Sequence, residues 1–279
     1  MTDAPYPAAP RRDGARASGP RFQRFFLLRE LVKRDLLARY AGSFLGLLWS
    51  VLQPLWQLLL FTFVFALVLK IALPPGARTG SFALYLFAAF VPWIAVQEGL
   101  VRGTSAITDG AELVKKMGLP PHLLVVTPIL GGLLQSAVAL TIFAVVAAAA
   151  GEADLRRCWL MLLVLPFQAA LTFGGALALS AMHVFLRDTL QLVHLALMTW
   201  FYLTPVVYPF ALVPKERALL HAVVRFNPLT AVVESYRAAF LGESIAWSTL
   251  APLWIAAPVV LLLGGAIFRT LRPAFADEI

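Results

Sequence analysis

Charged side chains are scarce in this sequence. Asp, Glu, Lys and Arg make up 14% of its 279 residues, and apolar residues make up 60%. Soluble domains carry about 25% charged and roughly 45–50% apolar residues, because their surfaces need polar cover. The shortage therefore excludes an ordinary water-soluble protein and indicates that much of the exterior faces lipid.

The sequence also lacks the residues of common catalytic and metal sites. Its single cysteine, Cys158, excludes an intrachain disulfide and a cysteine-based metal centre. It has no G-x-x-x-x-G-K-[ST] phosphate loop, no H-E-x-x-H and no G-x-S-x-G motif. We therefore expect no catalytic residue, no metal and no ATP site in this chain.

Long intervals without charge are the main positive feature. A transmembrane helix needs about 20 apolar residues, and a charge at mid-bilayer costs at least ~2.5–3.5 kcal/mol. Open strands would leave backbone groups unpaired in lipid, so we predict an all-α integral membrane protein with six transmembrane helices. The six intervals are Phe44–Leu69, Phe82–Val101, Leu123–Ala150, Trp159–Leu186, Thr189–Pro214 and Ile245–Phe268.

The distribution of Lys and Arg predicts the orientation of these helices. With the N-terminus inside, fifteen Lys and Arg residues fall on the inner side and eight on the outer side. The positive-inside rule then places both termini in the cytoplasm. The formal net charge of +8 follows the same pattern, so we interpret it as loop charge and not as a nucleic-acid-binding surface.

The chain divides into four predicted parts. The first is rich in Pro and Arg without an apolar block, which is typical of a disordered cytoplasmic tail. An amphipathic interface helix, the six-helix domain and a cytoplasmic C-terminal tail follow. Their bounds are 1–20, 21–41, 42–272 and 273–279.

In the second part, apolar and basic residues alternate. This pattern is typical of a helix that lies in the membrane interface, with its cations toward headgroups and its apolar residues toward the acyl chains. A plain electrostatic anchor on anionic lipid is the alternative. The cations singled out are Arg29, Lys33, Arg34 and Arg39.

The loop after the second span predicts a short helix within Asp109–Pro120, ended by Gly118 and Pro120. Leu113, Val114 and Met117 would share a face suited to a groove on a partner, with the polar residues Glu112, Lys115 and Lys116 beside it. An ordinary basic cytoplasmic loop is the alternative interpretation.

Two predicted spans carry stripes of aromatic and amide residues at helical spacing. Such stripes suit sugar rings, which offer apolar C–H faces and hydroxyl edges. An aromatic belt or simple helix packing is the alternative and the commoner use of such residues. The stripes are Trp49, Gln53, Trp56 and Phe63 in the first span, and Gln191, Met198 and Tyr202 in the fifth.

Between the fifth and sixth spans lies a segment too polar to cross the membrane. Asn227 can cap a helix with Pro228 at its first position, and Gly242 can end it. Tyr236 would lie on the apolar face of this helix and Arg237 nearer the polar side. We expect a short helix lying at the outer surface.

Glu98 is the only carboxylate within the six intervals, and an unpaired carboxylate in the membrane is expensive. Arg102 follows one helical turn later and can neutralise it. The alternatives are a structural ion pair and the mouth of a water-lined cavity.

Several sequence blocks resemble the permeases of ABC transporters that export polysaccharides, the type-2 exporters of O-antigen, capsule and teichoic acid. The resemblance runs in family order along almost the whole chain. Its blocks are residues 31–40 (LVKRDLLARY), 42–49 (GSFLGLLW), 53–54 (QP), 92–93 (PW), 113–116 (LVKK), 185–188 (FLRD), 204–209 (TPVVYP), 227–230 (NPLT) and 236–237 (YR).

This resemblance implies a homodimer of six-helix permeases in the bacterial inner membrane, docked to two ATP-binding cassette subunits. Those subunits would bind ATP and Mg, and the substrate would be an undecaprenyl-diphosphate-linked glycan. A small-molecule exporter of the same architecture, or a membrane enzyme acting on lipid-linked sugars, are alternatives.

By position, the resemblance also assigns roles to residues. Residues 21–41 correspond to the interface helix, and the two aromatic stripes to the glycan path. ATPase coupling falls to Glu112, Leu113, Val114, Lys115, Lys116, Met117, Arg187 and Asp188, and the outer gate to Asn227, Pro228, Tyr236 and Arg237.

Overall fold

Four long helices form the body of the molecule, here a computed structural model. They are α3 (Phe82–Asp109), α5 (Pro121–Ala149), α6 (Leu160–Phe185) and α10 (Trp247–Leu271). Among the described residues, these four segments are apolar and long enough to cross a membrane. The same residues contain no named strand, which confirms the all-α prediction. The structure describes residues 20–39, 41–70, 73, 77–214 and 216–278.

Two further apolar helices are shorter than predicted. Helix α2 (Trp49–Phe61) has 13 residues and is continued by the π-helix η2 (Thr62–Val68), and α7 (Thr189–Leu203) has 15. At 1.5 Å per residue, α7 is about 22 Å long, whereas a hydrocarbon core is ~30 Å thick. Helix α7 stops because Pro205 holds Thr204 in an extended conformation.

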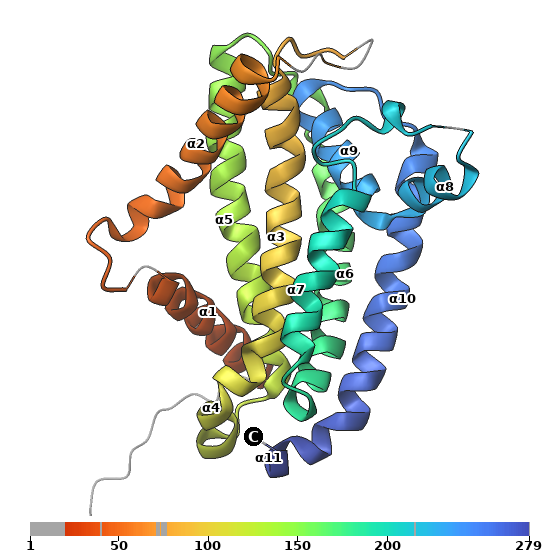
Figure 1. Cartoon of the computed structure of the whole chain (residues 1–279). Coiled ribbons are helices and arrows are strands. Elements are labelled where there is room, and N and C mark those ends of the chain that lie inside the picture. The colour runs from red at the N-terminus through yellow and green to blue at the C-terminus, as the bar shows by residue number, and fades with distance from the viewer. Residues whose placement is uncertain (1–19, 40, 71–72, 74–76, 215, 279) are drawn as a thin grey trace, which may run out of the picture.

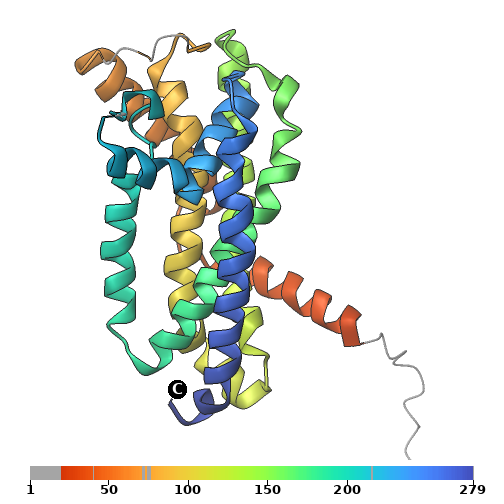
Figure 2. The ribbon, with the colours of Figure 1, turned by 90° about the vertical axis from the view of Figure 1, so that its right-hand side faces the viewer.

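Helix α3 is the centre of the packing. It contacts α5, α6, α7 and α9, and most of its residues are buried. Figures 1 and 2 show α3 running through the middle of the bundle, with α5 on one side and α6 and α10 on another. A buried aromatic cluster joins it to the neighbouring helices.

Helices α6 and α10 touch backbone to backbone. A Cβ added to Gly264 would lie 1.9 Å from the carbonyl oxygen of Gly174, and one added to Gly174 would lie 2.5 Å from the Cα of Leu261. Only glycine permits so close an approach, which is how small residues join helices in membranes. The two glycines therefore fix how these helices cross.

At one end of the bundle lie α8 (Ala218–Phe226) and α9 (Pro228–Leu241). As predicted, the Asn227 side chain accepts a hydrogen bond from the Leu229 N–H, Pro228 is the first helical residue, and Gly242 ends α9 with φ of 69°. Helix α9 does not lie at the surface, however. All its residues from Leu229 to Leu241 except Glu234 are buried, because α3, α6 and α10 surround it.

The opposite end holds α1 (Pro20–Arg39), α4 (Ala111–Met117) and the C-terminal α11 (Phe275–Glu278). Helix α1 leans against α5 and corresponds to the interface helix predicted at 21–41. Of the predicted tail at 1–20, all but Pro20 lies outside the described residues. Four short 3-10 turns complete the chain: η1 (Gly46–Leu48), η3 (Leu155–Arg157), η4 (Phe210–Leu212) and η5 (Arg272–Ala274).

Candidate functional site

Four charged side chains join α1 to α3. Asp35 and Arg39 lie one turn apart on α1, and Glu98 and Arg102 lie one turn apart on α3. Arg39 pairs with Glu98, Arg102 pairs with Asp35, and each arginine also pairs with the acid on its own helix, at 3.1 Å and 3.4 Å. We call these four residues the inner ion cluster.

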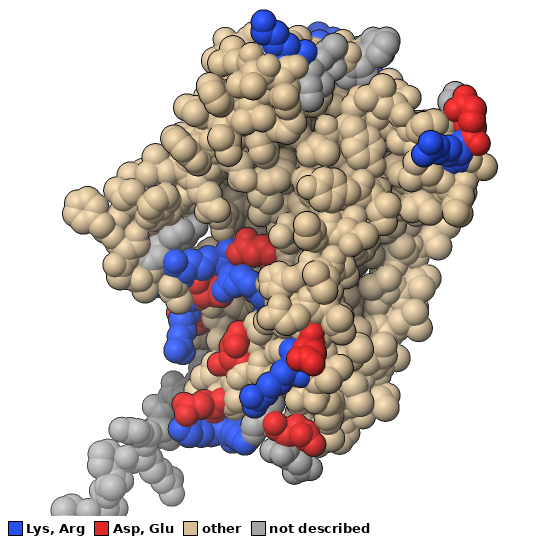
Figure 3. All heavy atoms as spheres, in the orientation of Figure 1, with Lys and Arg blue, Asp and Glu red and all other residues tan. Residues whose placement is uncertain are grey.

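The inner ion cluster is largely shielded from solvent. The Arg39 side chain is 9% exposed, and its guanidinium also donates to the Gln135 Oε1 of α5 at 2.8 Å. Opposite charges are balanced two against two, so neither helix leaves a charge unpaired at this depth. Figure 3 shows most of the charged side chains of this face over its lower half, below a broad band without charge, with a few more at the upper edge.

Sequence reasoning found only part of this cluster. The predicted Glu98–Arg102 pair is present, but Arg39 and Asp35 of the interface helix take part as well. The available signal was an acid four residues before an arginine in both segments, D-x-x-x-R at 35–39 and E-x-x-x-R at 98–102. Two such pairs can cross antiparallel and neutralise each other, but only the fold brings them together.

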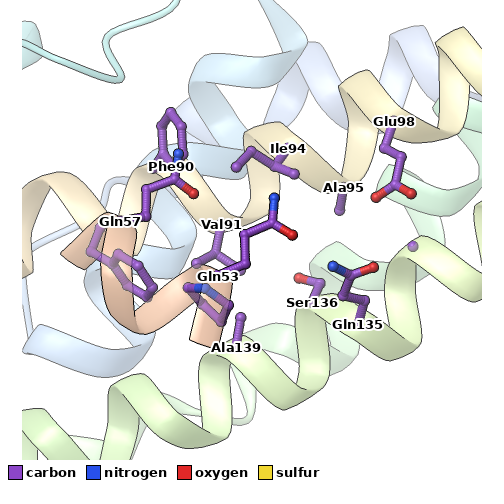
Figure 4. A pocket seen from close by; sticks show the side chains of 13 residues that line it. Gln53, Gln57, Phe90, Val91, Ile94, Ala95, Glu98, Gln135, Ser136 and Ala139 are labelled. Carbon is purple, nitrogen blue, oxygen red and sulfur yellow. The ribbon is translucent and has the colours of Figure 1, made fainter. Parts of the chain in front are cut away.

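Glu98 also borders a small cavity between α2, α3 and α5. Figure 4 shows Gln53 of α2 and Gln135 and Ser136 of α5 around this cavity, with Phe90, Val91 and Ile94 of α3 as its apolar wall. The Ser136 Oγ is buried without a hydrogen-bond partner among the described residues. The cavity volume of about 50 Å³ accommodates a few water molecules but not a sugar ring.

Helix α4 forms where the coupling helix was predicted. Gly118 ends it in the left-handed region with φ of 61°. Leu113 and Val114 do not face outward as expected. They pack on a cluster within the same chain, because α1 and the start of α5 supply the groove: Leu27, Leu28, Leu31, Leu119, Leu123 and Leu124.

What α4 presents to the outside is mostly polar. Glu112, Lys115 and Lys116 are exposed, and so is Met117 at its end. Lys116 and Glu112 form an exposed ion pair at 3.2 Å. Of the three apolar residues predicted to form one face, Met117 is exposed, whereas Leu113 and Val114 are partly buried against the same chain.

The turn between α6 and α7 carries Arg187 and Asp188, both exposed. Arg187 lines a cavity of about 270 Å³ together with Ala111 of α4, His183 of α6 and Glu278 of α11. The two predicted coupling segments therefore meet at one end of the molecule, next to the C-terminus.

The predicted aromatic stripes lie on the outside of the chain. Trp49, Trp56 and Phe63 are about half exposed or more. On α7, Gln191 is exposed, as are Met198 and Tyr202. Gln53 is exposed as well, and it also lines the cavity shown in Figure 4.

Asn227 ties the end of α7 to the start of α9. Its Oδ1 accepts from the Trp200 indole N–H at 3.0 Å and from the Leu229 N–H, and its Nδ2 donates to the Thr204 Oγ1 at 2.8 Å and to the Leu203 carbonyl. Every polar atom of this side chain is bonded. Asn227 is therefore a structural link as well as the helix cap that the sequence predicted.

Arg237 is buried and not near the polar side of α9 as expected, since its relative exposure is 0%. Its guanidinium donates to Glu234 at 2.8 Å, to the Val206 carbonyl at 2.9 Å and to the Tyr85 carbonyl at 3.2 Å. It also lies 3.8 Å from the centre of the Tyr85 ring. These partners are on α3, α9 and the segment after α7, so sequence periodicity could not reveal them.

Tyr236 is buried beside it. Its hydroxyl donates to the Gln168 Oε1 of α6 at 2.9 Å, and Gln168 in turn donates to the Pro92 carbonyl. Burial raises the pKa of Tyr236, an effect that the Gln168 hydrogen bond only partly opposes. The phenol therefore stays protonated and serves as a donor that holds α9 against α6.

Comparison with known proteins identifies the class to which this helical body belongs. Residues 27–241 match the model of the ABC-2 type transporter family, so the chain belongs to that family. This confirms the family resemblance drawn from the sequence blocks.

Curated relatives narrow the comparison. The O-antigen export system permease protein RfbA of Myxococcus xanthus is 31% identical over 254 residues, 91% of this chain and 95% of the relative. A protein of the same description from Klebsiella pneumoniae is 26% identical over the same shares. The polysialic acid transport protein KpsM of Escherichia coli is 22% identical over 88% of this chain and 93% of its own.

Proposed function

We propose that this chain is the membrane-spanning permease of an ABC transporter that exports a lipid-linked polysaccharide. The observation that carries the proposal is the similarity to O-antigen export permeases over 95% of their length. The chain also offers the parts that such a permease needs: apolar helices, a polar face at one end and exposed aromatic residues along α2 and α7.

The proposed topology has six spans and both termini in the cytoplasm of a bacterial inner membrane. Helices α2 and α7 supply the two spans that are short in the structure, α2 together with η2. The end with α1, α4 and α11 is the cytoplasmic one, because the charged side chains concentrate there. The end with α8 and α9 is then extracytoplasmic.

ATP hydrolysis is assigned to two separate ATP-binding cassette subunits, which bind ATP and Mg. They dock on the exposed part of α4, with Lys115, Lys116 and Met117, and on Arg187 and Asp188 in the α6–α7 turn. Leu113 and Val114 act indirectly, because they pass a movement of α4 to α1 through the leucine cluster. The exposed cations call for an acidic rim on the partner.

We further infer a homodimer in which the exposed faces of α2 and α7 lie toward the second copy of this chain. A channel on the dimer axis would then be lined by Trp49, Trp56 and Phe63 of α2 and by Met198 and Tyr202 of α7. Helices α8 and α9 would close it at the outer end.

The diphosphate of an undecaprenyl-linked substrate meets its cations on α1. Arg29, Lys33 and Arg34 are exposed there and suit an anionic headgroup beside the membrane surface. Arg39 belongs to a different group of residues, since Glu98 and Asp35 already neutralise it.

Vesicles that contain the permease and its ATPase subunit test the coupling assignment. Lys115→Gln with Lys116→Gln should reduce ATP-driven glycan translocation by at least about tenfold, because a docking contact of several charged hydrogen bonds is lost. The control removes two exposed cations from the other end, Arg156→Gln with Arg217→Gln. Equal translocation in the two double variants contradicts the docking assignment.

The substrate class needs a separate measurement. Trp56→Ala and Tyr202→Ala remove exposed rings from the proposed channel and should impair glycan export while a small dye passes unchanged. A transporter whose dye export falls while its glycan export stays intact is a small-molecule exporter.

A further inference from the structure

Helix α8 exposes several apolar side chains and turns two polar side chains toward a pocket. Its apolar residues Leu219, Val223 and Phe226 are exposed by 80%, 42% and 68%, whereas His221 and Arg225, on the opposite face, line a pocket toward α9 and α10. Val224 is the residue that α8 buries against its neighbours. Beside it, the space beneath α8 is lined largely by polar side chains.

The space under α8 is a pocket of about 280 Å³ at the outer end of the bundle, here named the outer pocket. Its polar side chains come from three helices, and the ring of Phe210 closes one side. The residues that matter to the argument are Phe210, His221, Arg225, Glu234, Ser248 and Thr249.

Glu234 is fixed as an acceptor in this pocket. Its Oε1 accepts from the Arg237 guanidinium at 2.8 Å, and Arg237 is itself anchored to the Tyr85 and Val206 carbonyls and fully buried. The carboxylate therefore cannot turn away without leaving the Arg237 charge unpaired, which is costly in a buried site. No other described residue bonds its Oε2, which remains an acceptor on the pocket wall.

The groups of the outer pocket match a hydroxylated ring. Glu234 accepts hydroxyl protons, Arg225 donates to hydroxyl oxygens, and Ser248 and Thr249 do both. The Phe210 and His221 rings, with centroids 5.2 Å apart, form a wall for the C–H face of a ring. Glu234 and Arg237 neutralise each other, so Arg225 leaves this region with a single positive charge, which suits a neutral or weakly anionic sugar better than a doubly charged phosphate.

The volume of the outer pocket favours a ligand of one or two sugar residues over a longer segment of the polymer. Ligand pockets usually measure about 300–1,000 Å³, and the outer pocket, at about 280 Å³, lies just below this range. It holds one or two sugar rings.

We propose that the outer pocket is a binding site for a sugar residue of the exported glycan, on the side where the chain leaves the membrane. This inference rests on the proposed function and adds to it a subsite within one protomer, next to the gate helices. A glycan held there is kept from sliding back while the transporter resets.

The test is sugar binding by the full permease with its ATPase subunit in lipid nanodiscs, followed by saturation-transfer difference NMR. The probe is the oligosaccharide mixture released by mild acid from the surface polysaccharide of the source cells, with lactate as a non-sugar reference. Arg225→Gln should reduce the sugar signal at least fivefold. Arg217→Gln, which removes an exposed arginine beside α8 but outside the pocket, should leave it unchanged.

A second variant covers the case in which Arg225 matters only for folding. Ser248→Ala keeps every hydrogen bond that the protein makes within itself and should still weaken the signal at least twofold. The proposal is overturned if the probe gives no signal above lactate, or if Arg225→Gln and Arg217→Gln behave alike. Export in vesicles by the same preparation shows whether the proposed function stands when the outer pocket binds no sugar.

Discussion

Helices α9 and α7 are similar in length and are separated in the chain by α8, but they are held in opposite ways. In α9 nearly every residue is buried and the polar side chains are bonded across three helices. In α7 only Thr189, Val193 and Leu197 are buried, and large residues such as Met198 and Tyr202 are exposed. The comparison separates a packed unit of α3, α5, α6, α9 and α10 from loosely attached helices at its side.

Lipid makes this difference informative. An apolar helix gains little by leaving the lipid for the protein, so close packing and hydrogen bonds hold membrane helices together. The packed unit has both, and its substitutions should affect stability. Helices α2 and α7 make few close packing contacts and few hydrogen bonds with the rest of the chain. Their large exposed side chains are therefore available for contacts outside this protomer.

The sharpest test of the packed unit is Arg237→Leu. The change leaves Glu234 without its cation and the Tyr85 and Val206 carbonyls without their donor. Breaking a buried pair on one side costs about 3–5 kcal/mol. We expect a large drop in the melting temperature of the detergent-solubilised protein, and Arg237→Lys should not restore it because an ammonium cannot reach all three acceptors. A melting temperature close to that of the wild type would show that the contacts of Arg237 do not hold α9 in the packed unit.

Gly264→Ala tests the α6–α10 crossing. The new methyl would collide with the Gly174 carbonyl, so the helices must separate, at a cost of about 1–3 kcal/mol. Gly265→Ala is the matched control, because nothing lies within 4 Å of a Cβ placed there. Thermal melting should distinguish the two alanines, and identical melting would show that the backbone contact does not hold this pair.

A double-mutant cycle on Arg39→Gln and Glu98→Gln measures the link between α1 and the packed unit. Both side chains are mostly shielded, so the coupling energy should be roughly 1–2 kcal/mol. The same cycle on the exposed pair Lys116 and Glu112 should give only about 0.3–0.5 kcal/mol. If the two cycles agree, α1 is held no more firmly than a surface helix.

The smallest effect concerns Cys158, at the edge of the packed unit. Burial raises the pKa of its thiol and the nearby Asp154 adds to this, so less thiolate is present at neutral pH than for a free cysteine. Maleimide labelling should be slower than for Leu155→Cys in a Cys158→Ser background, and its rate should rise at higher pH. Equal rates at all pH values would place Cys158 in water.

Local signals predicted a good part of the structure. The helix bounds near Gly118 and at Asn227, Pro228 and Gly242 followed from capping rules, which depend on adjacent residues only. Helical spacing likewise predicted that the aromatic residues of α2 share a stripe, and the structure shows these rings exposed. The transporter family followed from short blocks spread along the chain.

Errors appeared where a residue meets partners from distant segments. Arg237 was expected near the polar side because its charge favours water, yet backbone carbonyls from two other segments satisfy it inside. Leu113 and Val114 were expected to face a partner, but α1 and α5 provide their contacts within the chain. The length of α7 was overestimated because the chain stays apolar after Pro205 has ended the helix.

The sequence by itself determined that this protein is an apolar helical chain of a transporter family, with its cations toward one end, because hydropathy, charge and capping act over neighbouring residues. Only the tertiary structure decided which charges meet in the inner ion cluster, which arginine is buried and which face of α8 lines a pocket. These depend on how helices far apart in the chain cross, and the crossings follow from packing between surfaces that no single segment contains.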